Sequence, residues 1–241
     1  MPRVLMVLTG AKTWTMKNGS PHPTGFWAEE FVGPHRIFTE AGVDVSVATP
    51  GGVKPTVDPL SLDPKYNEGG GMTGQQSVDD QLGYLEQMDG ALSTPLKLEE
   101  VDAANYDVVF LVGGHGPMQD MAVHPTVGDL LVATLDDPNK IVAAVCHGSA
   151  GFLPAHRPDG TWLFAGRELT GFSNEEETAA TFAGNAPWLL EDRLRLAGAR
   201  YRADPAWTPH VVVDGNLITG QQQVSAKVTA AAVMEKLQVT A

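Results

Sequence analysis

Hydrophobic residues gather in short continuous runs along this chain, and each of the strongest runs ends at a glycine. Four of them are rich in Val, Ile and Leu: residues 3–10, 44–52, 106–116 and 140–148. Continuous rather than alternating apolar runs are typical of strands buried on both faces, as in a parallel sheet covered by helices. Two later runs, residues 168–172 and 211–220, predict further strands, the second with a turn at residues 214–216.

Segments with the character of helices alternate with these strands. They are residues 24–42, 125–135, 187–198 and 224–237. Gly42 and Gly198 stand where a helix would stop. The alternation predicts an α/β fold of three layers, flavodoxin-like, with a mostly parallel sheet flanked by helices.

Residues from about 55 to 100 interrupt this rhythm, because they contain many Gly, Asp, Pro and Gln residues and little sustained periodicity. We interpret them as a small, loop-rich cap inserted into a single domain of residues 1–241. Ligands of such sheets bind beyond the carboxyl ends of the strands. The residues that directly follow each strand are therefore the candidates for chemistry.

Charge and composition narrow the possible partners. The formal net charge is −13, from 16 basic and 29 acidic residues. An acidic surface repels phosphate groups, so neither nucleic acid nor an anionic membrane is an expected partner. No apolar stretch approaches the roughly 18 residues that cross a bilayer, and the single cysteine excludes an intrachain disulfide. We expect a soluble, cytoplasmic protein.

That cysteine, Cys146, follows the strand of residues 140–145 directly. Ala144 precedes it by two positions and Gly148 follows by two, which matches the spacing of a nucleophile elbow with Ala in the place of the first glycine. A helix N-terminus at this turn would lower the pKa of the thiol and favour the thiolate. The alternative is that Cys146 is a small buried hydrophobic residue, and the adjacent His147 could point away from it.

The preceding strand ends in Gly113-Gly114-His115-Gly116. Consecutive glycines expose backbone N–H groups, so Gly114 is a candidate oxyanion donor together with the N–H of His147. The pattern also suits a simple tight turn, in which His115 is only a loop residue.

Glu29 and Glu30 stand side by side in the first predicted helix, and its phase separates them. With Trp27 at zero and roughly 100° per residue, Glu30 falls near about 300°, inside the apolar arc, and Glu29 near about 200°, on the polar face. A buried carboxyl group has a raised pKa suited to proton transfer. Glu30 is therefore the candidate, unless it reaches solvent from the helix edge.

Three acids, Glu175, Glu176 and Glu177, follow Ser173 and Asn174. Ser173 or Asn174 could cap a helix whose first turn favours acidic residues without any catalysis. One of the three could still orient His147, as the third member of a triad does.

Five segments together resemble the ThiJ/PfpI superfamily, a branch of the class I glutamine amidotransferase-like fold, and within it the glyoxalase III and heat-shock chaperone branch. They are residues 24–30 (TGFWAEE), 110–116 (FLVGGHG), 143–148 (AAVCHG), 170–174 (TGFSN) and 214–220 (DGNLITG). The resemblance implies that Cys146 is the nucleophile, His147 its base and Glu30 the acid in contact with it. It further implies an oxyanion hole from Gly114 and His147, with Glu177 as the best match for the triad acid.

The resemblance also implies a homodimer that converts small 2-oxoaldehydes such as methylglyoxal to 2-hydroxy acids such as lactate, without metal or cofactor. Hydrolysis of peptides, amides or glycated adducts by the same thiolate is an alternative, and a holdase chaperone or oxidative stress sensor is another. Glutamine amidotransferase activity is not implied, because the late His210 is followed by Val-Val-Val rather than x-Glu. The chain departs from the family pattern at Ser149, where proline is common, and at residues 221–223 (QQQ), where Gln-Asn-Pro is usual.

Overall fold

A seven-stranded sheet forms the centre of the molecule in the computed structural model, which describes residues 1–67 and 71–237. The strand order is β10-β11-β7-β6-β1-β4-β5. The bounds are β1 Arg3–Val7, β4 Asp44–Thr49, β5 Leu96–Lys97, β6 Val108–Leu111, β7 Ile141–Val145, β10 Val211–Asp214 and β11 Leu217–Gly220. All neighbouring pairs are parallel except the β10–β11 hairpin. The mostly parallel sheet predicted from the apolar runs is confirmed.

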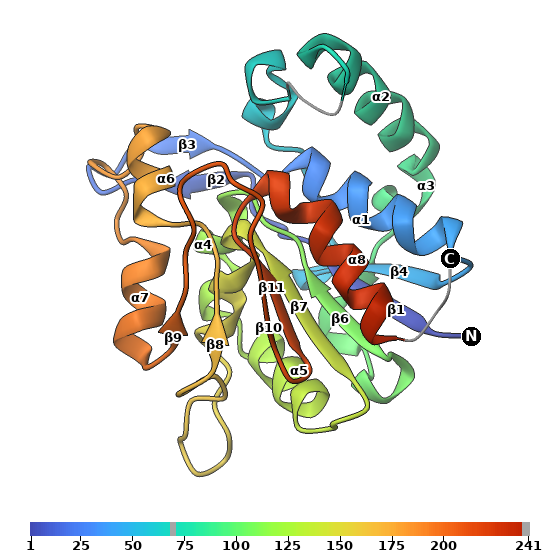
Figure 1. The fold of residues 1–241 in the computed structure, drawn as a ribbon, viewed down its shortest axis with the longest axis vertical. Coiled ribbons are helices and arrows are strands. Elements are labelled where there is room, and N and C mark those ends of the chain that lie inside the picture. Colours follow the sequence, from blue (N-terminus) through green and yellow to red (C-terminus); the bar gives the residue numbers. More distant parts are fainter. Residues whose placement is uncertain (68–70, 238–241) are drawn as a thin grey trace.

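Helices flank this sheet (Figure 1). Within the described residues, the α-helices of more than six residues are α1 Ala28–Glu40, α2 Gly74–Gln87, α5 Pro125–Leu135, α7 Leu190–Ala197 and α8 Ala226–Lys236. Helices α1 and α8 pack against each other, and both α8 and α5 contact β7, in which every residue is buried. Because side chains alternate along a strand, burial of all five positions requires cover on both faces. Among the helices of the described residues, none combines the length and the hydrophobicity of a membrane-spanning segment.

Glycine ends two of the predicted helices in the structure. Gly42, just past α1, has a φ of 76°, and Gly198, the C-cap of α7, has a φ of 108°. Both values lie in the left-handed region that glycine adopts without steric cost.

The structure differs from the sequence prediction in residues 55–67 and 71–100, which contain more regular structure than a loop-rich cap. Helix α2 has 14 residues and lies outside α1 (Figure 1), followed by the short helix α3, Asp89–Ser93. Helix α2 begins with a capping box in which Thr73 and Gln76 exchange hydrogen bonds. Few of its residues are buried, so hydrophobic periodicity gave only a weak signal for it.

Smaller elements lie around the main sheet. They are the hairpin of β2 Thr13–Thr15 and β3 Pro21–Pro23, the short helices α4 Gly116–Gln119 and α6 Asn174–Ala179, and the pair β8 Glu168–Leu169 and β9 Arg200–Tyr201. The predicted strand of residues 168–172 is thus shorter than expected and pairs outside the main sheet. Its remaining residues lead to α6 and so reach the site described next.

Candidate active site

Cys146 lies where β7 ends and a 3-10 segment, Cys146–Phe152, begins. Its φ is 58°, in the left-handed region that is costly for a residue with a side chain. The close approach of neighbouring backbone explains the need for glycine here, since a Cβ on Gly148 would lie 2.5 Å from the carbonyl oxygen of Leu111. The sharp strand-to-helix turn expected for a nucleophile elbow is therefore present at Cys146.

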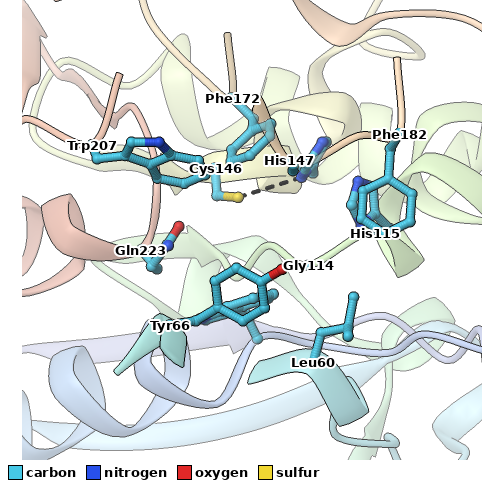
Figure 2. Close-up of a pocket in the computed structure, with 12 residues that line it drawn as sticks. Leu60, Tyr66, Gly114, His115, Cys146, His147, Phe172, Phe182, Trp207 and Gln223 are labelled. Carbon is cyan, nitrogen blue, oxygen red and sulfur yellow. Dashed lines mark hydrogen bonds between the residues drawn. The ribbon is translucent and has the colours of Figure 1, made fainter. Parts of the chain in front are cut away.

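The Cys146 thiol faces the imidazole of His147, and Figure 2 shows the two side chains at one side of a pocket. Sγ lies 3.3 Å from His147 Nδ1, and His147 Nε2 lies 2.7 Å from Oε2 of Glu177. All three residues are buried. The structure thus joins a thiol, an imidazole and a carboxylate in one chain of hydrogen bonds.

The protonation of this chain follows from its partners. Burial alone would raise the pKa of Glu177, but His147 and His115 outweigh it and hold that pKa well below its usual value. Burial lowers the pKa of His147, so its imidazole is neutral. An ionised Glu177 can only accept hydrogen bonds, so His147 carries its proton on Nε2 and presents the Nδ1 lone pair to the thiol.

Glu30 faces the interior from the first turn of α1, as the helical phase predicts, and is fully buried. Its carboxyl group lies close to Cys146, and both side chains pack against Gly113. A Cβ added to Gly113 would lie 2.5 Å from Glu30 Oε2 and 2.8 Å from Cys146 Cβ. Burial raises the pKa of Glu30 well above its usual value, and contacts with Cys146 and Gly113 offset this only in part. Glu29 instead pairs with Lys227 of α8, at 3.0 Å.

The expectation of a lowered thiol pKa is wrong for the resting protein. Burial raises the pKa of Cys146 well above its usual value, and the neighbouring Glu30 adds to this. The backbone N–H groups of Gly114 and His147 act in the opposite direction but do not outweigh burial. The thiol therefore keeps its proton at rest, and the neutral Nδ1 of His147 is the group placed to remove it.

Gly114 and His147 place backbone N–H groups beside Cys146, as the sequence predicts for an oxyanion hole. The φ of Gly114 is 96°, and a Cβ at this position would collide with the carbonyl oxygen of Gly25. Trp27 N–H also donates to the Gly113 carbonyl, at 3.0 Å. The start of α1 and the end of β6 are thereby held together next to the thiol.

The three consecutive acids have separate places in the structure. Glu176 forms a capping box with Ser173 at the start of α6, and Glu175 is exposed. Glu177 faces His147. Of the three acids left open by the sequence, Glu177 alone contacts His147 within the described residues.

His115 belongs to the site, although the sequence suggested at most a loop residue. Its Nε2 lies 2.8 Å from Oε1 of Glu177, and its ring stacks on Trp14 with centroids 4.7 Å apart. It is 5% exposed. Glu177 thus accepts a hydrogen bond from each of two buried imidazoles. The feature of the sequence that could have identified His115 is its position shortly after β6. Strand β6 pairs with β7, the strand that leads to Cys146.

An apolar pocket of about 30 Å³ opens on the thiol. Its lining includes five aromatic side chains other than histidine: Trp27, Tyr66, Phe172, Phe182 and Trp207. Leu60 and Tyr66, between β4 and α2, supply one wall, and Figure 2 shows both across the pocket from Cys146. The volume is enough for about two or three water-sized groups, so the pocket suits a small molecule.

His115, His147 and Glu177 also form the kind of group that holds a metal ion, because their ligand atoms lie within 4.8 Å of one another. Both Nε2 atoms already donate hydrogen bonds to the Glu177 carboxylate. A metal ion would have to displace both of these protons. The donor set as it stands is better suited to holding the His147 tautomer than to ligation.

A cysteine on a strained turn after a parallel strand, next to a buried His–Glu pair, defines an α/β protein with a nucleophile elbow. Residues 23–236 match the model of the DJ-1/PfpI family, and the chain belongs to that family.

Individual proteins and solved structures are also similar to this chain. Over 135 residues the chain is 33% identical to glutamine amidotransferase-like class 1 domain-containing protein 1 of Bos taurus, covering 56% of this chain but only 61% of that protein. It is 27% identical to glyoxalase 3 of Candida albicans, covering 95% of this chain and 96% of that protein. The crystal structure of that glyoxalase III has a TM-score of 0.76 at 25% identity, covering 99% of this chain and 98% of the other.

The Francisella tularensis rapid encystment protein of 24 kDa has a higher TM-score, 0.83, at 26% identity. That match covers 98% of this chain and 99% of the other. The relatives of this chain therefore include a named glyoxalase, and the fold of this chain matches a glyoxalase III structure over nearly its full length.

The hydrogen bonds of Glu177 predict the reactivity of Cys146. In a Glu177→Gln variant the side-chain amide can donate a hydrogen bond to His147 Nε2. The neutral ring then carries its proton on Nδ1, and Nδ1 can no longer accept the thiol proton. We expect the rate of Cys146 alkylation by iodoacetamide at pH 7 to fall about 10- to 100-fold, measured by mass spectrometry. Glu175→Gln, an exposed neighbour on the same helix, is the control and should react like the wild type. Equal rates in Glu177→Gln and the wild type would contradict the assigned tautomer.

The raised pKa of Glu30 predicts how stability depends on pH. A carboxyl whose folded pKa is raised stabilises the fold fully below its unfolded pKa, and this contribution is lost as pH rises towards the folded pKa. A Glu30→Gln variant has no carboxyl group to ionise at this position, so it does not lose stability in this way as pH rises. We expect its thermal midpoint to equal that of the wild type near pH 4 and to exceed it at pH 7 by at least about 2 °C.

Calorimetry between pH 4 and 7 measures this difference, with the exposed Glu40→Gln as the control. A variant less stable than the wild type at pH 7 would show that Glu30 is ionised in the folded protein.

Proposed function

We propose that this chain is a cofactor-independent glyoxalase of the glyoxalase III type, which converts a small 2-oxoaldehyde such as methylglyoxal to the 2-hydroxy acid. The observation that carries the proposal is the position of His147 Nδ1, 3.3 Å from Cys146 Sγ, beside a small apolar pocket. The match to a named glyoxalase over 95% of the chain supports it.

The first step forms a hemithioacetal. His147 Nδ1 takes the thiol proton as Sγ bonds to the aldehyde carbon C1, and the carbonyl electron pair moves to its oxygen. The N–H groups of Gly114 and His147 stabilise the oxyanion until His147 returns the proton to it. Because His147 has a lowered pKa, it gives this proton up readily and is again a neutral base.

The second step moves hydrogen from C1 to C2. His147 removes the C1 proton, the C1–H electron pair forms a C1=C2 double bond, and the C2 carbonyl pair moves to oxygen, which gives an enediolate. The C1 hydroxyl proton then passes to the C2 oxygen, C1=O re-forms, and His147 returns its proton to C2, which leaves a thioester on Cys146. Glu30, kept protonated by burial, is the acid beside the sulfur. Water then hydrolyses the thioester to the hydroxy acid and the free thiol.

The size of the pocket favours this reaction over hydrolysis of a peptide. The lining is largely aromatic and the cavity is small, so a three-carbon aldehyde suits it better than a chain of several residues. A metal ion or organic cofactor has no part in these steps.

Lactate production tests the proposal. Purified, metal-stripped protein is expected to form lactate from methylglyoxal without glutathione, and Cys146→Ala and Cys146→Ser to lose this turnover by at least about 10³-fold. Enzymatic assay of lactate measures the product, and the same variants run against peptides, amides and glycated adducts test the hydrolase alternative. Absence of lactate from the wild type would reject the glyoxalase, and unchanged turnover in Cys146→Ala would reject the mechanism.

A further inference from the structure

Three glutamines, Gln221, Gln222 and Gln223, follow β11 and are all buried, with exposed fractions of 0%, 0% and 8%. The first two hold a neighbouring loop. The Gln221 amide bonds to both backbone groups of Asp204, accepting from its N–H at 2.9 Å and donating to its carbonyl at 3.0 Å. Gln222 Nε2 donates to the Thr208 carbonyl at 2.8 Å. These two amides therefore have structural partners.

The third glutamine differs in what its side chain contacts. Within residues 1–67 and 71–237, the side-chain amide of Gln223 forms no hydrogen bond with the protein, although only 8% of the residue is exposed. It lines the pocket that contains Cys146 and His147. Figure 2 shows its amide near Trp207, across the pocket from His115 and Phe182. The residue is buried as a whole, but its amide atoms remain accessible from the pocket. An amide that faces a pocket in this way is free to bond to a ligand there.

The sheet fixes Gln223 relative to the thiol. Strand β11 pairs in parallel with β7, with Gly220 opposite Val145. The glutamine segment and Cys146 therefore leave adjacent strands at the same level. Gln223 begins a 3-10 turn, Gln223–Ser225, in which Ser225 Oγ donates to the Gln222 side chain. This bond and those from Gln221 and Gln222 hold the backbone on either side of Gln223.

We infer that Gln223 orients the substrate by donating from Nε2–H to the oxygen on C2 of a 1,2-dicarbonyl compound bound at Cys146. The inference rests on the proposed function and extends it to the second carbonyl group. In the proposed mechanism, the backbone N–H groups of Gly114 and His147 donate hydrogen bonds to the oxygen on C1. The oxygen on C2 therefore needs a different donor. The pocket lining contains no Lys or Arg among the described residues, so the donor to this oxygen is a neutral group, and Gln223 supplies one from the segment that follows β11.

The chemistry of the second step gives this donor its effect. When His147 removes the C1 proton, the C2 carbonyl pair moves onto oxygen and negative charge develops there. A preorganised N–H donor stabilises that charge more strongly than it stabilises the neutral ketone. Loss of the donor should therefore reduce kcat as well as raise KM.

Gln223→Met tests this role, because methionine keeps the length of the side chain and removes the amide. We expect kcat for methylglyoxal to fall at least about tenfold, with KM raised, and Gln223→Asn to retain more activity than Gln223→Met. Gln87→Met, an exposed position on α2, is the matched control and should equal the wild type. Unchanged kcat and KM in Gln223→Met, with an unchanged thermal midpoint, would overturn the inference and leave the glyoxalase intact.

A second measurement separates this inference from the proposed function. Pyruvamide is a 1,2-dicarbonyl compound without a hydrogen on C1, so it binds without isomerising. We expect pyruvamide to protect Cys146 of the wild type from methyl methanethiosulfonate, and Gln223→Met to need about tenfold more for equal protection, a loss of about 1.4 kcal/mol. The unprotected rate should be the same in both. Equal protection would overturn the inference even if the wild type forms no lactate.

Discussion

The carboxylate of Glu177 accepts hydrogen bonds from two buried imidazoles, those of His115 and His147, at 2.8 and 2.7 Å. This shared carboxylate stays ionised because the two histidines outweigh the effect of its burial on its pKa. An ionised acceptor fixes the proton of His147 on Nε2, and only then is Nδ1 a base directed at the thiol. The removal of the thiol proton, and with it the proposed chemistry, depends on this one arrangement.

The parallel sheet brings these groups together from distant parts of the chain. Strands β6, β7 and β11 are adjacent and point the same way, so His115, Cys146 and Gln223 all follow strands that end at one edge. Burial then acts on each titratable group differently. It keeps Glu30 and Cys146 protonated and His147 neutral, which is an acid, a nucleophile and a base in one small volume.

Much of this arrangement was predictable from the sequence. The continuous apolar runs predicted the parallel sheet, the spacing around Cys146 predicted its turn, and helical phase predicted burial of Glu30 rather than Glu29. The residues alone left Glu175, Glu176 and Glu177 open, and the resemblance favoured Glu177; recognition of the capping box of Ser173 and Glu176 would have narrowed the choice without it. The thiol pKa was predicted in the wrong direction, because burial depends on long-range packing that no local pattern reports.

The tautomer of His147 is the central claim, and ¹⁵N nuclear magnetic resonance of protein labelled at histidine measures it directly. The account predicts that at pH 7 His147 Nε2 carries a proton and Nδ1 carries none, and that the ring stays neutral below the pH at which an ordinary histidine titrates. A protonated Nδ1 or an imidazolium ring at pH 7 would contradict it, because neither form can remove the proton of Cys146.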